Sequence, residues 1–132
     1  MHEPEAAFRL VSVIDGLLSA DDSSQSDLAR KTAQRAVILT GSDDGDRLAT
    51  RDLVAKAYAV RSSYAHGNSP KKVDLAALRT LTRKVITAWI VLSDDSPGQP
   101  LSETLDDALL SAQAFEESVR RPLKEFREQL QS

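Results

Sequence analysis

The stretch Arg61-Ser62-Ser63-Tyr64-Ala65-His66-Gly67 combines two side chains that together can act on a phosphate. An arginine carries a permanent positive charge that holds an anion, whereas a histidine gains and loses a proton near neutral pH. The chain has only two histidines, and His66 is the one that lies beside this arginine. A helix end that carries this pair is a place to hold a phosphate and move a proton.

Apolar residues at helical spacing predict a helix from about 47 to 65 that ends at Gly67: Leu53, Ala57, Val60 and Tyr64. Five residues of an unbroken α-helix rotate by roughly 140° net, which would separate the Arg61 and His66 side chains. Gly67 lets the last turn tighten or unwind, which would allow His66 to swing toward Arg61. The alternative is that Arg61 pairs with a carboxylate while His66 caps the helix. Spacing alone leaves both open.

The charge of the chain is unevenly distributed. The formal net charge is −3, but residues 1–46 carry −5, residues 47–90 carry +7 and residues 91–132 carry −5. Because the basic third contains the Arg61–His66 stretch, the asymmetry indicates an anionic partner. The alternative for each lysine or arginine is that it solvates a helix face.

The remaining sequence predicts an all-α fold, a single-domain bundle of four to five helices that is antiparallel where loops are short. We expect helices at 4–19, 27–40, 47–65 and 71–92, with a further helix from Ser102, and a loop at 42–46. The helix at 71–92 has the clearest periodicity. Its apolar stripe predicts Trp89 as a core residue.

The C-terminal end has a weaker pattern, which Pro122 interrupts. We expect residues 119–130 to form a separate short helix or a partner-binding arm. The domain assignment is therefore a helical bundle over 1–115 and a helical tail over 116–132, packed on the bundle or on a partner.

The sequence lacks the residues needed for several kinds of catalytic or metal site. The chain has no cysteine and no glycine-rich phosphate loop, and its two histidines are far apart. We therefore expect no cofactor and no metal ion. The absence of cysteine, of a signal-peptide pattern and of a long apolar run favours a cytoplasmic protein without membrane contact.

The segment Tyr58-Ala59-Val60-Arg61-Ser62-Ser63-Tyr64-Ala65-His66-Gly67 resembles the signature of HEPN domains, helical proteins with an arginine, four to six spacer residues and a histidine. The form "Tyr, two residues, Arg-Ser, three residues, His-Gly" is most similar to the Apea-like HEPN branch. The helix ending in Ala36-Val37-Ile38-Leu39-Thr40-Gly41 and the later Leu101–Leu110 segment agree with it. The resemblance covers about Phe8 to Leu110.

The resemblance implies a metal-independent endoribonuclease that works as a homodimer. Arg61 would neutralise the scissile phosphate, and His66 would act as general base or acid, giving a 2′,3′-cyclic phosphate. Ser62 and Tyr64 would support the site, Tyr64 more by packing between the two copies than by stacking on a base. The candidate RNA contacts are Arg51, Lys56, Lys71 and Lys72.

The family also implies a setting in toxin–antitoxin or phage-defence systems, in which an antitoxin or another defence protein would be a partner. The alternative, from a different class, is a non-catalytic HEPN module that binds nucleotide or protein, or dimerises, through the same helix end. A third is a structural bundle whose basic helices dock an acidic partner.

Overall fold

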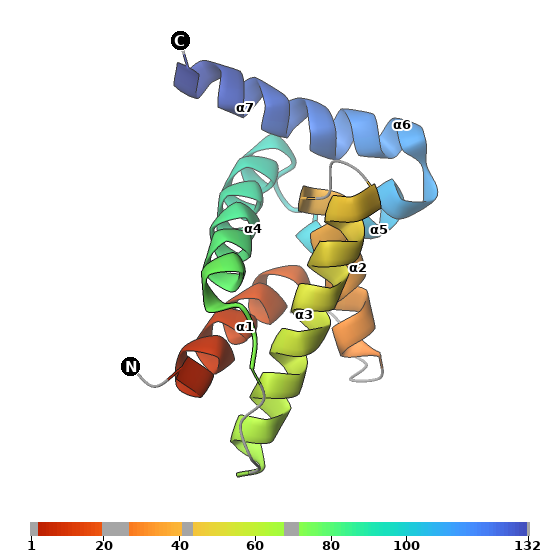
Figure 1. Ribbon diagram of the computed structural model, residues 1–132. Helices are drawn as coiled ribbons and strands as arrows, with labels where there is room; N and C mark the ends of the chain where they lie inside the picture. The colour runs from red at the N-terminus through yellow and green to blue at the C-terminus, as the bar shows by residue number, and fades with distance from the viewer. Residues whose placement is uncertain (1–2, 20–26, 41–43, 68–71, 132) are drawn as a thin grey trace.

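The computed structural model describes residues 3–19, 27–40, 44–67 and 72–131, and within these ranges the protein is helical with no strand (Figure 1). The predicted all-α class is confirmed. The elements are α1 (Glu3–Ser19), α2 (Leu28–Thr40), α3 (Asp44–Ala65), α4 (Leu75–Asp95), α5 (Leu101–Leu110), α6 (Ala112–Phe115), the π-helix η1 (Glu116–Arg120) and α7 (Arg121–Gln131). None of the described helices has the length and apolarity needed to cross a membrane.

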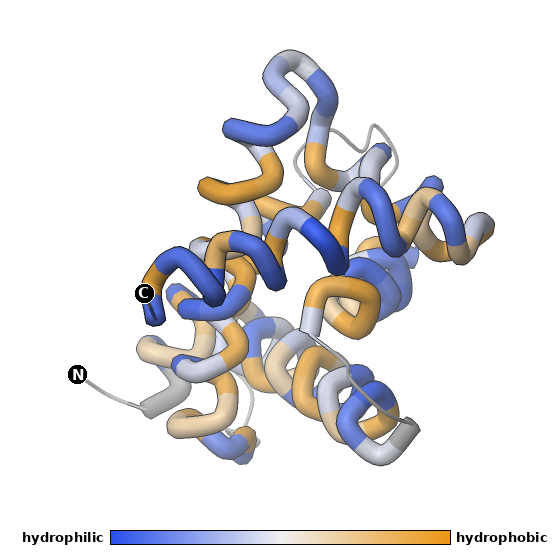
Figure 2. Tube along the Cα trace, turned by 90° about the horizontal axis from the view of Figure 1, so that it is seen from above, coloured by the Kyte–Doolittle hydropathy of each residue, from blue (hydrophilic) through white to orange (hydrophobic). Residues whose placement is uncertain are grey.

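The core lies between α1, α3 and α4, with α2 packed along α3 and α5 against α2. Hydrophobic and hydrophilic residues alternate along the helices, as expected for helices that each bury one face (Figure 2). The large side chains that are almost fully buried are Ile14, Leu18, Leu78, Leu105, Val11, Val54, Val60, Val85 and Val119. Val119 belongs to η1, so the C-terminal segment contributes to the same core.

Helix α3 ends at Ala65, as predicted, but it begins at Asp44 rather than near Arg47. The predicted loop at 42–46 is wrong from Asp44 onward, and residues 42–43 lie outside the described residues. Carboxylates are favoured in the first turn, where the helix dipole is positive, so Asp46 is compatible with a helix start.

Helix α4 begins at Leu75 and not at residue 71. Asp74 is its N-cap, because its carboxylate accepts a hydrogen bond of 3.0 Å from the backbone N–H of Ala77. The prediction of a buried Trp89 is also wrong, because the side chain is 42 % exposed. In this turn of α4 the buried side chain between Val85 and Leu92 is that of the neighbouring Ala88, which is 3 % exposed.

Pro122 does not break the C-terminal helix. The helical path runs from Ala112 to Gln131 through the π-helical turn η1, and α7 lies across one end of the bundle (Figure 1). The N–H of Arg121 bonds to the carbonyl of Glu116, five residues earlier. This wider turn directly precedes the proline and accommodates its missing N–H and its bulky ring, which an ordinary α-turn does not.

Candidate functional site

The Arg61–His66 stretch forms the last turns of α3, at the end of the bundle opposite α7 (Figure 1). The N–H of His66 still bonds to the carbonyl of Ser62 at 3.1 Å, and only the N–H of Gly67 turns to Tyr64, at 3.3 Å. Gly67 adopts a φ of 69°. The α-helical hydrogen bonding therefore continues to His66, and the chain tightens only after it. For His66 to swing toward Arg61, the helix would have to tighten or unwind before His66.

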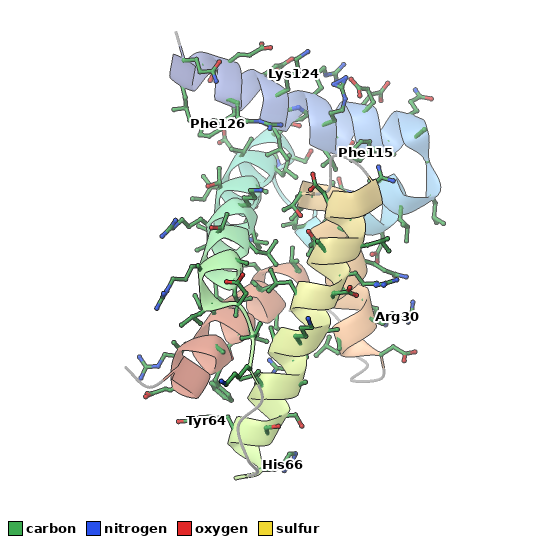
Figure 3. The ribbon with its side chains drawn as sticks, in the orientation of Figure 1. Arg30, Tyr64, His66, Phe115, Lys124 and Phe126 are labelled. Carbon is green, nitrogen blue, oxygen red and sulfur yellow. The ribbon has the colours of Figure 1, made fainter. Side chains whose placement is uncertain are left out.

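The structure does not bring Arg61 and His66 together within one chain. The intact helix separates the two side chains by about 140° around its axis, and among the described residues no hydrogen bond or ion pair joins them. His66 is exposed. Figure 3 shows His66 at the tip of α3, with Tyr64 projecting to the other side of the helix.

Arg61 is held from two sides by its own chain. Its guanidinium lies 3.7 Å from the carboxylate of Asp15 in α1, and 4.5 Å from the centre of the Tyr58 ring one turn earlier. The side chains of Arg61 and Asp15 are each 24 % exposed. A carboxylate partner for Arg61, one of the two arrangements that the sequence left open, is thus present, and the guanidinium is anchored close to the surface.

Tyr58 links this anchor to the interior. Its hydroxyl lies 2.5 Å from Asp15 Oδ1 and 3.1 Å from Thr32 Oγ1. Thr32 in turn shares a buried hydrogen bond of 2.7 Å with Ser19. The carboxylate of Asp15 therefore contacts both the Arg61 guanidinium and the Tyr58 hydroxyl. These two side chains of α3 fix the orientation of a carboxylate that belongs to α1.

The hydrogen bonds continue to the buried guanidinium of Arg35, which is only 4 % exposed. Its Nη1 donates to Ser19 Oγ at 3.1 Å and to the carbonyl of Leu18 at 3.0 Å. Its Nε and Nη2 form a bidentate pair with Asp106 of α5 at 2.9 and 2.8 Å. A polar chain thus crosses the bundle from Arg61 to Asp106.

Sequence reasoning did not find Asp15, Tyr58 as an anchor, or Arg35. A signal exists for Arg35, because it lies three residues after Thr32 and next to Ala36 on the buried face of α2. An arginine in the apolar stripe of a helix needs a buried counter-ion. No local pattern identifies Asp15 as the partner of Arg61.

Burial, and after it the hydrogen bond to Asp15, raise the pKa of the Tyr58 phenol from 10.0 to about 12. A raised pKa means that folding favours the neutral phenol. The contribution of this group to stability is therefore complete below pH 10 and is lost as the pH rises through about 12.

We expect this ionisation to be visible in a Tyr64→Phe variant, in which Tyr58 is the remaining tyrosine. Its phenolate absorbance should stay low at pH 10 and rise toward about pH 12. A Tyr58→Phe variant is the matched control, because it reports the exposed Tyr64. A midpoint near pH 10 in the Tyr64→Phe variant would contradict the buried phenol–carboxylate bond.

The supporting residues lie on different sides of the helix end. Ser62 is exposed, and the neighbouring Ser63 is 5 % exposed and thus buried. Tyr64 is 44 % exposed and contacts the ring of Phe8 in α1, with ring centres 5.3 Å apart. This aromatic pair forms an apolar surface beside the end of α3.

The candidate RNA contacts are scattered. Arg51 is exposed, lies 3.1 Å from Asp52 and lines a hollow against α2. Lys56 lines a different hollow against α4. Lys72 is exposed beyond the helix end, and Lys71 lies outside the described residues. Arg51 and Lys56 therefore do not share one surface, since five helical residues separate them by about 140°.

Comparisons of the chain with protein-family models, curated proteins and solved structures found no match. Within the described residues, no group of three or more metal-ligating side chains is placed to hold a metal ion. The fold and the site define an all-α protein with an exposed imidazole at a helix end and an anchored guanidinium just over one turn before it.

Proposed function

We propose that this protein is a metal-independent endoribonuclease of the HEPN type that acts as a homodimer. The observation that carries the proposal is the end of α3, where an exposed His66 follows a guanidinium already held near the surface by Asp15 and Tyr58. An accessible proton-transfer group and a fixed positive charge are the two requirements for cleaving RNA through its own 2′-hydroxyl.

In this reaction the 2′-hydroxyl oxygen attacks the adjacent phosphorus and the bond to the 5′-oxygen breaks. His66 accepts the proton of the 2′-hydroxyl or returns a proton to the leaving 5′-oxygen, and Arg61 balances the charge on the phosphate oxygens. The products are a 2′,3′-cyclic phosphate and a 5′-hydroxyl. No oxidant or cofactor enters the balance.

The geometry of one copy supports the proposal of a second copy. Because Arg61 and His66 leave α3 on different sides, one phosphate meets both kinds of side chain most simply between two helix ends related by a two-fold axis. The partly exposed pair of Tyr64 and Phe8 offers an apolar contact for such an arrangement.

Asp15 and Tyr58 are positioning residues in this proposal. They orient the guanidinium before RNA binds, which lowers the entropic cost of holding the phosphate. The ion pair spans 3.7 Å and is partly exposed, so a phosphate with a full negative charge can compete for the same guanidinium.

The second candidate function is a non-catalytic module that binds nucleotide or protein, or dimerises, through the same helix end. The engagement of Arg61 by Asp15 and Tyr58 favours it, because that guanidinium already has partners in its own chain.

Fluorescent single-stranded RNAs of varied sequence, incubated with the purified chain in EDTA, separate the two candidates. The nuclease should give fragments with 3′ ends that resist phosphatase until acid opens the cyclic phosphate. Arg61→Ala should abolish cleavage, whereas Arg79→Ala, an exposed cation on α4, should not. If the chain binds the RNA but leaves it intact, the non-catalytic binding module is the correct function and the nuclease proposal is wrong.

A further inference from the structure

We propose that a groove lined with basic residues, formed by α2, α3 and the C-terminal helices, binds an acidic amphipathic helix of a partner protein. The groove consists of two hollows that meet at Ile38 and Arg47, which line both. One hollow of about 500 Å³ lies between α2, α3 and the end of α5. The other, of about 370 Å³, lies between α2, the start of α3, the end of α6, η1 and α7.

The groove is separate from the Arg61–His66 end. Arg47 lies in the first turn of α3 and His66 just past its end, roughly 28 Å away along the helix axis. Figure 1 shows α7 crossing the end of the bundle where α2 ends and α3 begins. The inference therefore stands without the proposed nuclease activity.

The floor of the first hollow is aliphatic and open. Leu48 is 52 % exposed and Leu109 is 49 % exposed, and both face the hollow beside Val37 and Ala33. Exposed leucines that gather around a depression indicate a contact surface more strongly than single exposed leucines do. An apolar side chain entering this hollow would remove that area from water.

The lining carries positive charge only. Six basic residues and no acidic residue line the two hollows, although the whole chain has a net charge of −3. The six are Arg30, Arg47, Arg51, Arg120, Lys124 and Arg127. A partner that fits this lining presents carboxylates beside its apolar side chains.

Three of the six cations make exposed ion pairs with carboxylates outside the lining: Arg30–Asp27 at 3.6 Å, Arg51–Asp52 at 3.1 Å and Arg120–Glu116 at 3.0 Å. Exposed pairs contribute only about 0–1 kcal/mol and exchange partners readily. Neither Arg47 nor Lys124 makes an ion pair among the described residues, and Arg47 lies where the two hollows meet.

The aliphatic floor favours a protein helix over single-stranded RNA. Proteins bind single-stranded nucleic acid by stacking its bases on aromatic rings, and Phe115 is the one aromatic residue in the lining of the two hollows. A helix with apolar residues at i, i+3 or i+4 and i+7 instead lays them into such a groove, while Asp and Glu at its flanks meet the arginines.

A display library of helical peptides, in which all residues on one face are varied, is selected for binding to the full chain. This selection tests the proposed groove. Bound sequences are expected to be enriched in the apolar i, i+3 or i+4, i+7 pattern together with Asp and Glu. The affinity of the strongest peptide is measured by fluorescence anisotropy. It should be at least about tenfold weaker for Leu109→Asp, which removes an apolar contact, and for Arg47→Glu, which removes a contact with a carboxylate of the peptide.

Two matched variants serve as controls. Leu110→Asp alters the neighbouring leucine, which is 87 % exposed and outside the lining, and Arg79→Glu alters an exposed cation on α4. Both should bind the peptide as the unmodified chain does. Four results would overturn the inference. The first three are no enrichment, enrichment without acidic residues, and equal losses of peptide binding in the controls. The fourth is that the chain binds RNA instead of peptide and that Arg47→Glu removes this RNA binding. A dimer that Leu109→Asp dissociates would assign the groove to a second copy and overturn it as well.

Discussion

Replacement of His66 by alanine is expected to reduce RNA cleavage by a factor of about 10² to 10⁴, the usual contribution of a positioned acid–base group. The imidazole is exposed at the end of α3 and takes part in no hydrogen bond or ion pair that joins it to other described side chains. Its removal should therefore change proton transfer and leave the fold as it is. The measurement is the initial rate of RNA cleavage in EDTA, relative to the unmodified chain.

Two checks distinguish a catalytic from a structural effect. The His66→Ala chain should keep its helical circular dichroism and its elution volume in size-exclusion chromatography, because an exposed side chain contributes little to stability. A His66→Ala variant that cleaves RNA at the original rate would rule out the proposed role of this imidazole.

Mixing His66→Ala with Arg61→Ala tests whether two copies share the site. In an equal mixture, half of the dimers contain one copy of each variant. If one copy supplies the guanidinium and the other the imidazole, each such heterodimer has one intact site of two, and the activity should return to about a quarter of the original. If both groups must come from the same copy, the mixture stays inactive. The test therefore separates a composite site from a site within one chain.

Replacement of Arg35 by alanine is expected to destabilise the protein by about 3–5 kcal/mol. The side chain is 4 % exposed, so its removal leaves a cavity between α1, α2 and α5. It also leaves the carbonyl of Leu18 and the hydroxyl of Ser19 without the donor that the structure provides. The measurement is the free energy of unfolding from urea denaturation.

Arg30→Ala is the matched control, because Arg30 lies on the same helix with a side chain that is 58 % exposed. Its effect should stay within about 0.5 kcal/mol. If Arg35→Ala also costs less than about 1 kcal/mol, the hydrogen-bonded chain from α1 to α5 does not stabilise the fold in the way the burial indicates.

The local sequence was sufficient to predict the all-α class and most of the helices. The helical repeat of apolar residues and the stop signal at Gly67 are properties of neighbouring residues, so the end of α3 at Ala65 agrees with the structure. The errors occurred where small angular or geometric differences matter. Trp89 follows the apolar spacing, but the neighbouring Ala88 takes the buried position in that turn. Pro122 is tolerated because a π-helical turn precedes it.

The sequence by itself determined that an arginine and a histidine, the side chains of the proposed phosphate reaction, lie at the end of a helix. The tertiary structure alone decided what surrounds them: Tyr58 meets Asp15 across 43 residues, and Arg35 meets Asp106 across 71. The groove lined with basic residues likewise combines residues from α2, α3, α5, α6, η1 and α7. The physical reason is that helix formation depends on contacts within a few residues, whereas such pairings depend on how the finished helices pack.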